Sequence, residues 1–337
     1  MQVLVTGGAG FVGTEVVRQL VDRGDRVVVL DRHEPTVKGA DWEPGDIRDA
    51  EAWKRASVEA DAVCHLAAKV GLGVDLGDMA SYVEHNDAGT SVGLRVLYEQ
   101  RFTGRLVLAS SMVVYGEGRY DCAAHGAVRP GPRRAEDLEA GRFDPLCPQC
   151  GATLEARQVG EDAPLDPRNV YAATKLHQEH LCEVFGRETG ASVAALRYHN
   201  VYGRGMPRDT PYAGVAAIFA SEVASGRAPQ VFEDGRQRRD FVHVRDVARA
   251  TVMAAVAPPD VVGPLNIATG QPRTVGDLAA ALWHAGGSQG PVPQVTGDFR
   301  VGDVRHVFAS PERASDLLGF RAEIPFEEGL ADLFADR

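Results

Sequence analysis

The sequence has few cysteines, a deficit of basic residues and no long apolar segment. Its 337 residues include five cysteines, too few for a disulfide scaffold and compatible with reduced thiols in the cytoplasm. Lysine and arginine number 36 against 47 aspartates and glutamates, and this net charge of −11 argues against nucleic-acid or anionic-membrane partners. No apolar run reaches membrane-spanning length, and the first residues show no targeting pattern. We therefore expect a cytoplasmic protein.

Short apolar runs alternate with helical patterns in the first half of the chain. Continuous apolar runs are typical of parallel strands that are covered on both faces. The repeated strand–helix–strand order predicts an α/β fold with a doubly wound parallel sheet. The runs are Val3–Val5, Val27–Leu30, Ala62–Leu66, Leu106–Ala109 and Val193–Leu196.

Two regions interrupt this alternation and suggest a domain division. Residues 117–162 are rich in glycine, proline, arginine and acids, which indicates an insertion into the α/β framework. Beyond residue 200 the pattern becomes irregular and proline-rich. We expect a dinucleotide-binding domain over residues 1–200, a smaller domain over 201–337, and a return of parts near 240–270 to the main sheet.

A glycine-rich loop follows the first predicted strand and precedes an amphipathic helix. Gly7 permits a tight turn, Gly10 lets the backbone approach a pyrophosphate, and Gly13 lets the helix pack closely. Asp31 ends the second predicted strand, where a carboxylate can accept from a ribose hydroxyl. The pattern predicts a dinucleotide site rather than a turn without a ligand. Asp31 favours NAD, and the adjacent Arg32 leaves NADP open.

A tyrosine and a lysine lie four residues apart in a predicted helix that begins near Asn169. Tyr171 and Lys175 would share one face, and a neighbouring ammonium lowers the pKa of a tyrosine hydroxyl. Ser111 ends another predicted strand, where it could bond a reacting oxygen. The three residues could exchange a proton with a substrate alcohol. Taken singly, each also fits a surface or capping role.

The chain resembles the extended short-chain dehydrogenases/reductases of the nucleotide-sugar epimerase/dehydratase group. The resemblance covers nearly the whole chain outside residues 117–162. Its motifs, in order, are Gly7–Gly13, Gly45–Asp49, His65–Ala68, Ser110–Gly116, Tyr171–Lys175, Leu196–Gly203, Arg239–Val244 and Arg300–Asp303.

The resemblance implies a Rossmann fold, an NAD site, a nucleotide-sugar site and a homodimer. Tyr171 would be the acid/base, Lys175 its pKa partner and a ribose ligand, and Ser111 a hydrogen-bonding helper. The implied substrate-binding residues are Ser111, Asn200, Arg239 and Arg300. The implied NAD-binding residues are Gly7, Gly10, Phe11, Val12, Gly13, Asp31, Arg32, Asp46, Ile47, Leu66, Ala67, Ala68, Lys69, Asn86, Tyr171 and Lys175.

One departure from the group narrows the expected reaction. The 4,6-dehydratases of this group carry an Asp-Glu pair where this chain has Met112 and Val113, and neither side chain exchanges protons. This disfavours dehydration and favours oxidation and re-reduction at C4, which is epimerisation through a 4-keto sugar. An NAD(P)H-dependent 4-ketoreductase and a non-catalytic dinucleotide sensor remain alternatives.

The insertion carries two paired metal-ligand motifs. Cys122 and His125 form one pair and Cys147 and Cys150 the other, each with ligand-x2-ligand spacing and a following glycine. Two such knuckles supply a closed tetrahedral Cys3His set, which predicts structural zinc. The alternatives are unrelated residues or a redox pair at Cys147 and Cys150. The remaining thiols, at positions 64 and 182, are predicted to be buried.

The insertion also resembles one found in bacterial deoxysugar-nucleotide 4-epimerases of the dTDP-L-rhamnose 4-epimerase type. The segment Thr210–Phe219 shares this narrower resemblance. It implies a dTDP- or UDP-linked sugar as the substrate, with neither the base nor the stereochemistry fixed.

Overall fold

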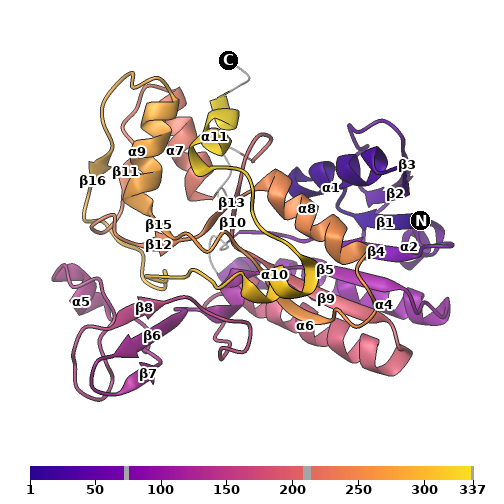
Figure 1. Ribbon diagram of the computed structural model, residues 1–337, viewed down its shortest axis with the longest axis horizontal. Coiled ribbons are helices and arrows are strands. Elements are labelled where there is room, and N and C mark those ends of the chain that lie inside the picture. The colour runs from indigo at the N-terminus through magenta and orange to yellow at the C-terminus, as the bar shows by residue number, and fades with distance from the viewer. Residues whose placement is uncertain (72–75, 208–213, 335–337) are drawn as a thin grey trace.

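A seven-stranded parallel sheet lies at the centre of the molecule (Figure 1). The computed structural model describes residues 1–71, 76–207 and 214–334, so residues 210–213 of the segment noted above lie outside it. In spatial order the strands are β14 (Gly263–Ile267), β9 (Ser192–Tyr198), β5 (Arg105–Ser111), β4 (Ala62–His65), β1 (Gln2–Thr6), β2 (Arg26–Asp31) and β3 (Ala40–Pro44).

Helices cover both faces of this sheet. One face carries α1 (Phe11–Asp22) and α8 (Val244–Ala255), and the other carries α2 (Ala50–Ala56), α4 (Gly89–Glu99) and α6 (Val170–Thr189) (Figure 1). The strand order reverses between β1 and β4, because β2 and β3 lie to one side of β1 and the later strands to the other. This arrangement confirms the predicted α/β fold with a parallel sheet.

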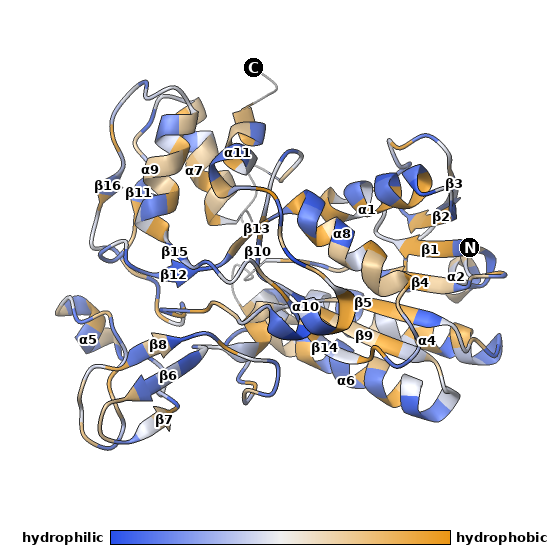
Figure 2. Ribbon diagram, in the orientation of Figure 1, coloured by the Kyte–Doolittle hydropathy of each residue, from blue (hydrophilic) through white to orange (hydrophobic). Residues whose placement is uncertain are grey.

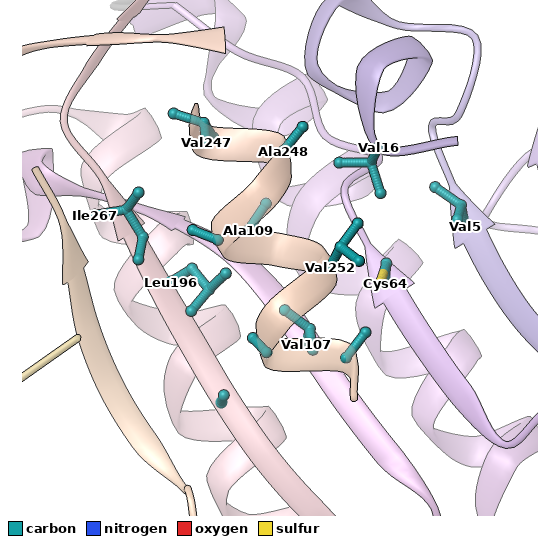
Figure 3. Close-up of a cluster of buried hydrophobic side chains, with 14 of the residues drawn as sticks. Val5, Val16, Cys64, Val107, Ala109, Leu196, Val247, Ala248, Val252 and Ile267 are labelled. Atoms are coloured by element: carbon teal, nitrogen blue, oxygen red, sulfur yellow. The ribbon is translucent and has the colours of Figure 1, made fainter. Parts of the chain in front are cut away.

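The apolar strand runs form the main core. Val107 on β5, Leu196 on β9 and Val252 on α8 face one another between the sheet and the helix (Figure 3). Cys64 lies in the same cluster and is fully buried, as predicted. Figure 2 shows apolar central strands and a mainly polar strand β6 (Arg119–Cys122) in the insertion. Burial on both faces therefore explains why these strands read as unbroken apolar runs.

A second set of elements packs beside the carboxyl ends of the strands. Its helices surround a separate apolar core that includes Phe219, Phe241 and Leu282. The elements are α7 (Val215–Ala224), α9 (Val275–Ala285), α11 (Phe326–Ala331), β10 (Asn200–Tyr202), β11 (Gln230–Val231), β12 (Arg238–Arg239), β13 (Phe241–His243), β15 (Arg273–Thr274) and β16 (Gln294–Val295).

The insertion forms a three-stranded antiparallel sheet. β6 (Arg119–Cys122) pairs with both β7 (Gly126–Val128) and β8 (Glu155–Arg157), and α5 (Ala135–Glu139) follows β7. The remaining helices are α3 (Met79–Tyr82) and α10 (Glu312–Leu318), with 3₁₀ turns at Leu76–Asp78, Met112–Tyr115 and Asp332–Phe334 and a π-helical segment at Val83–Ala88. Within the described ranges, no helix is both long and apolar enough to cross a membrane.

Helix α6 has well-defined ends that fix the position of its first turn. Asn169 adopts an extended conformation, and its Oδ1 accepts from the Ala172 N–H at 2.8 Å. Gly190 ends the helix in the left-handed conformation. Asn169, two residues before Tyr171, thus sets where the helix begins.

We predict that Asn169→Ala lowers the free energy of unfolding by about 1 kcal/mol, because the Ala172 N–H in the first turn loses its acceptor. Asn169→Asp is the control, since it keeps an acceptor at the cap and adds a favourable charge. Urea unfolding measures both. Equal losses in the two variants would contradict a capping role.

Candidate active site

A cavity of about 840 Å³ opens at the carboxyl ends of the parallel strands. Its walls include the loop after β1, the ends of β2 and β5, and the first turns of α6. This edge is where open α/β sheets bind their ligands. The sequence-predicted residues that line it are Gly7, Gly10, Phe11, Val12, Gly13, Asp31, Arg32, Asp46, Ile47, Leu66, Ala67, Ala68, Lys69, Ser111, Tyr171, Lys175 and Asn200.

The glycine-rich loop brings backbone close to the cavity. Gly7 has a φ of +73°, and a Cβ there would meet the Ala67 backbone at 2.8 Å. A Cβ at Gly13 would lie 2.0 Å from the Gly7 carbonyl oxygen, so the close approach is to the loop itself. Helix α1 begins at Phe11 without a side-chain cap. Its first-turn N–H groups and positive dipole end suit a phosphate.

Two acidic side chains are held on the cavity wall. Asp31 Oδ2 accepts from the Ala9 N–H at 3.1 Å and Oδ1 from the His33 N–H at 3.0 Å, which fixes the carboxylate beside the loop. A hydrogen bond from Arg48 lowers the pKa of Asp46 to about 2, so this group is ionised at neutral pH. A fixed carboxylate at Asp31 can accept from ribose hydroxyls and repels a 2′-phosphate.

Tyr171, Lys175 and Ser111 meet at one place on the wall. The Lys175 Nζ lies 5.9 Å from the centre of the Tyr171 ring, and Ser111 is near enough to Tyr171 to act on the pKa of its hydroxyl. Burial nevertheless raises the pKa of Tyr171 to about 12 and outweighs the lowering by Ser111. Burial, the largest cause, therefore acts against the predicted lowering of this pKa when only protein groups are present. The Lys175 Nζ donates to the Ala109 carbonyl at 2.7 Å.

Lys175 is a buried cation. Its side chain belongs to a residue only 3% exposed, and burial lowers its pKa to about 8. A lysine that titrates near neutrality changes charge more readily than an exposed one. Helix α6 therefore places Tyr171 near Lys175, whose side chain can change its charge close to neutral pH.

Three sequence-predicted residues lie away from the cavity lining. Asn86 is fully buried, and its amide joins the Lys69 backbone, at 2.7 and 3.0 Å, to Thr174 at 2.9 Å. The Arg239 guanidinium donates to three backbone carbonyls, and Arg300 lies 5.2 Å from the centre of the Phe232 ring. Asn86 thus fixes the Lys69 segment of the cavity wall from within the protein interior. Neither arginine belongs to the described lining of the cavity.

A buried ion pair beneath the site was not predicted. Glu179 accepts two bonds from Arg197, at 2.7 and 3.0 Å, and also accepts from the Ser110 hydroxyl. It therefore ties α6 to the ends of β5 and β9, one residue from Ser111. The available signal was spacing, since Glu179 follows Lys175 by four residues on the same helical face.

The Cys/His group of the insertion is assembled. The ligand atoms of Cys122, His125, Cys147 and Cys150 all lie within 4.8 Å of one another. The Cys122–Cys150 sulfur separation is 3.7 Å, and His125 Nδ1 lies 3.5 Å from the sulfurs of Cys122 and Cys147. Tetrahedral zinc with bonds of about 2.3 Å to sulfur and about 2.0 Å to nitrogen requires edges of roughly 3.8 and 3.5 Å. The donor set therefore fits zinc.

We predict that Lys175→Met changes the pH dependence of stability. Lys175 has a folded-state pKa of about 8 against an ordinary value of 10.5, so the unfolded chain binds more protons between these pH values. The cost of burying the charge is complete below pH 8 and decreases as pH rises. From pH 7 to 9.5, wild type should gain roughly 2 kcal/mol of unfolding free energy relative to Lys175→Met.

Denaturant unfolding of both proteins at several pH values measures this difference. Lys38→Met is the control, because Lys38 is exposed and its removal should produce no comparable drift. A pH-independent difference between wild type and Lys175→Met would show that Lys175 keeps its ordinary pKa.

Comparisons with known proteins agree with this geometry. Residues 3–148 and 149–268 match the model of the NAD dependent epimerase/dehydratase family. The chain is 32% identical to the dTDP-L-rhamnose 4-epimerase of Burkholderia thailandensis, over 98% of this chain and 93% of that protein. It is 28% identical to the UDP-glucose 4-epimerase of Bacillus subtilis, over 98% and 95% of the two chains.

Solved structures give the same result. The UDP-glucose 4-epimerase of Thermus thermophilus in complex with NAD superposes with a TM-score of 0.78 at 30% identity, covering 99% of this chain and 97% of that one. The Thermotoga maritima UDP-glucose 4-epimerase with UDP-glucose gives 0.79 at 28% identity, covering 100% and 99%. With the family model matched over most of its length, the chain belongs to the NAD dependent epimerase/dehydratase family.

Proposed function

We propose that this protein is an NAD-dependent 4-epimerase of a dTDP- or UDP-linked sugar, with a deoxysugar as the favoured substrate. The observation that carries the proposal is the meeting of Ser111, Tyr171 and Lys175 on the cavity that the glycine-rich loop also lines. The names of the relatives support C4 of a nucleotide sugar as the reacting centre.

Residues of the first domain hold the cofactor. The α1 N-terminus would receive the pyrophosphate, Asp31 would bond the adenosine ribose, and Asp46 and Ile47 would flank the adenine. NAD would supply a reversible hydride acceptor whose oxidised ring also carries positive charge. Lys175 and Tyr171 on α6 would bond the nicotinamide ribose. The Asp31 carboxylate is the reason for choosing NAD over NADP.

Tyr171 moves the proton of the reaction. With NAD bound, the positive charge of its oxidised ring would lower the pKa of Tyr171. The Tyr171 oxygen would then take the proton of the sugar 4-hydroxyl while the C4 hydrogen passes as hydride to NAD, which would give a 4-keto sugar. After the sugar turns over, hydride returns to the opposite face and Tyr171 gives the proton back. Ser111 bonds the reacting oxygen throughout. One proton and one hydride leave and return, so no cofactor is consumed.

The nucleotide-sugar diphosphate is assigned to the second domain, residues 201–337, and to its border with the first. Asn200 lies on the cavity wall, and Arg239 and Arg300 are the cationic donors that suit a diphosphate. In the described arrangement both guanidiniums have protein partners. We infer that their remaining N–H groups bond the diphosphate when the substrate binds.

We also infer that Cys122, His125, Cys147 and Cys150 hold a structural zinc ion. Three of the six ligand–ligand distances match the edges of a tetrahedral site, and all six are within 4.8 Å. Four protein ligands leave no position for a substrate. The Ala124 backbone N–H and His125 lower the pKa of Cys122 to about 6, which favours the ligating thiolate.

A homodimer in the cytoplasm completes the proposal. The family resemblance favours a dimer contact on α4 and α6. Tyr98 on α4 and Val184 on α6 are 65% and 49% exposed, which leaves apolar surface on both helices for a second copy.

Tyr171→Phe should lower the epimerisation turnover by at least a hundredfold, because the acid/base hydroxyl is lost. NMR of dTDP-, UDP- and GDP-sugars incubated with NAD-loaded enzyme measures the exchange of C4 epimers. Tyr98→Phe is the control, since Tyr98 is outside the cavity lining and the substitution keeps the apolar ring that the proposed dimer contact would use. Near-normal turnover in Tyr171→Phe removes this residue from the mechanism, and stoichiometric NADH or NADPH consumption with a keto sugar indicates a ketoreductase.

The zinc proposal is tested by metal analysis after dialysis against EDTA. Wild type should retain about one zinc ion per chain, and Cys150→Ser should lose it, because a three-ligand set binds more weakly. Cys182→Ala serves as the control, since Cys182 is buried in the other core cluster. Retention by Cys150→Ser, or a Cys147–Cys150 disulfide in the mass spectrum of wild type, would contradict structural zinc.

A further inference from the structure

The insertion reaches across to the second set of elements through a buried group of charges. Arg133 lies between β7 and α5, and its side chain is 5% exposed. Its Nη1 lies 2.7 Å from Glu233 Oε1, and Glu233 is 3% exposed. Removing one partner of a doubly buried ion pair is strongly destabilising, because the other charge then stays buried without a partner. The insertion is therefore attached at a defined point.

Glu233 joins Arg133 to a second buried arginine. Its other oxygen lies 2.7 Å from Nη1 of Arg305, which is fully buried. Arg305 also bonds Asp234 at 2.7 and 2.9 Å, and its Nε bonds Asp144 of the insertion at 2.8 Å. Two insertion residues, Arg133 and Asp144, thus enter one network with the segment that carries Arg305.

The same arginine holds the backbone of that segment. Arg133 donates through Nε and Nη2 to the Asp303 carbonyl oxygen, at 3.2 and 2.6 Å. The next two carbonyls, of Val304 and Arg305, accept from Arg239 at 2.7 and 2.8 Å. Arg133 and Arg239 therefore bind three consecutive carbonyls of one strand-like segment.

Both arginines assigned to the diphosphate depend on this segment. Arg239 is bonded to it directly, and Arg300 lies three residues before Asp303. The Arg300 guanidinium rests 5.2 Å from the centre of the Phe232 ring, next in sequence to Glu233, and the Glu233 N–H bonds the Asp298 carbonyl at 2.7 Å. A displacement of residues 298–305 would therefore move both guanidiniums.

We propose that Arg133 is a positioning residue of the nucleotide-sugar site. By holding Asp303 and Glu233 together, it keeps residues 298–305 where Arg239 and Arg300 can receive the diphosphate. The insertion thereby sets substrate affinity without touching the substrate. This inference rests on the proposed function, because it concerns the diphosphate end of that site.

The test compares three variants at Arg133 with one at its neighbour. Arg133→Met removes the bonds to Asp303 and Glu233. In Arg133→Met, Glu233 keeps only Arg305 as a cationic partner, so the double variant with Glu233→Gln also removes the partly unpaired charge and limits the destabilisation. Arg133→Lys keeps the positive charge, but a single ammonium cannot reproduce the planar set of bonds from Arg133 to both Glu233 and the Asp303 carbonyl. Arg134→Met is the matched control, because Arg134 is 68% exposed and pairs only locally, with Asp137.

Calorimetric titration with dTDP and UDP and with NAD, together with steady-state kinetics, measures the effect. We expect Arg133→Met and the double variant to bind the nucleoside diphosphate at least tenfold more weakly and to raise KM similarly. NAD affinity and kcat at saturation should stay within twofold of wild type. Arg133→Lys should be intermediate and Arg134→Met unchanged. Hydrogen exchange at the amides of residues 303–307 should accelerate in Arg133→Met alone among the single Met variants.

Other outcomes overturn the inference. Wild-type diphosphate affinity in both Arg133→Met and the double variant would show that the insertion does not position the site. A parallel loss of NAD binding, kcat and melting temperature would show a general structural role. If wild type binds no nucleoside diphosphate, the proposed function itself fails and this inference fails with it, whereas normal wild-type binding with unaffected variants overturns only the role of Arg133.

Discussion

The parallel direction of all seven strands is the constraint on which the site depends. Because every strand runs the same way, the residues that follow β1, β2, β4, β5 and β9 arrive at one edge. For this reason, residues that are distant in sequence line the same cavity: Gly7, Asp31, Ala67, Ser111 and Asn200. Reversing one strand would remove its terminal residue from the wall, so the cavity is a property of the sheet and not of any single loop.

Buried charged side chains connect the elements that surround the proposed site. Glu179 and Arg197 tie α6 to the strand ends beneath Ser111, and Lys175 bonds the Ala109 carbonyl. In the second set of elements, the buried Glu233–Arg305 ion pair connects the segment after β11 to the segment that carries Arg305. Such groups are costly to desolvate, and hydrophobic replacements often stabilise proteins. Their presence near the cavity indicates that position, rather than stability, is what they supply.

Much of the site could be predicted because it depends on local sequence. The glycine loop, Asp31 and the Tyr171–Lys175 pair follow from short spacings, and the structure brings them to one cavity. The direction of the Tyr171 pKa could not be predicted, because it depends on how deeply the hydroxyl is buried, and spacing along the chain does not reveal burial. The placement of Asn86 and Arg239 also depends on partners far along the chain, which spacing does not reveal.

The pairing of β6 with β8 has a consequence for how such a chain can vary. Arg119 lies opposite Arg157, so the chain enters and leaves the insertion at adjacent points. The path from β5 to α6 is therefore almost the same length whether or not the intervening residues are present. A unit attached in this way can be lengthened, shortened or exchanged while the parallel sheet keeps its order, provided that its polar contacts, among them those with residues 233 and 303–306, are replaced.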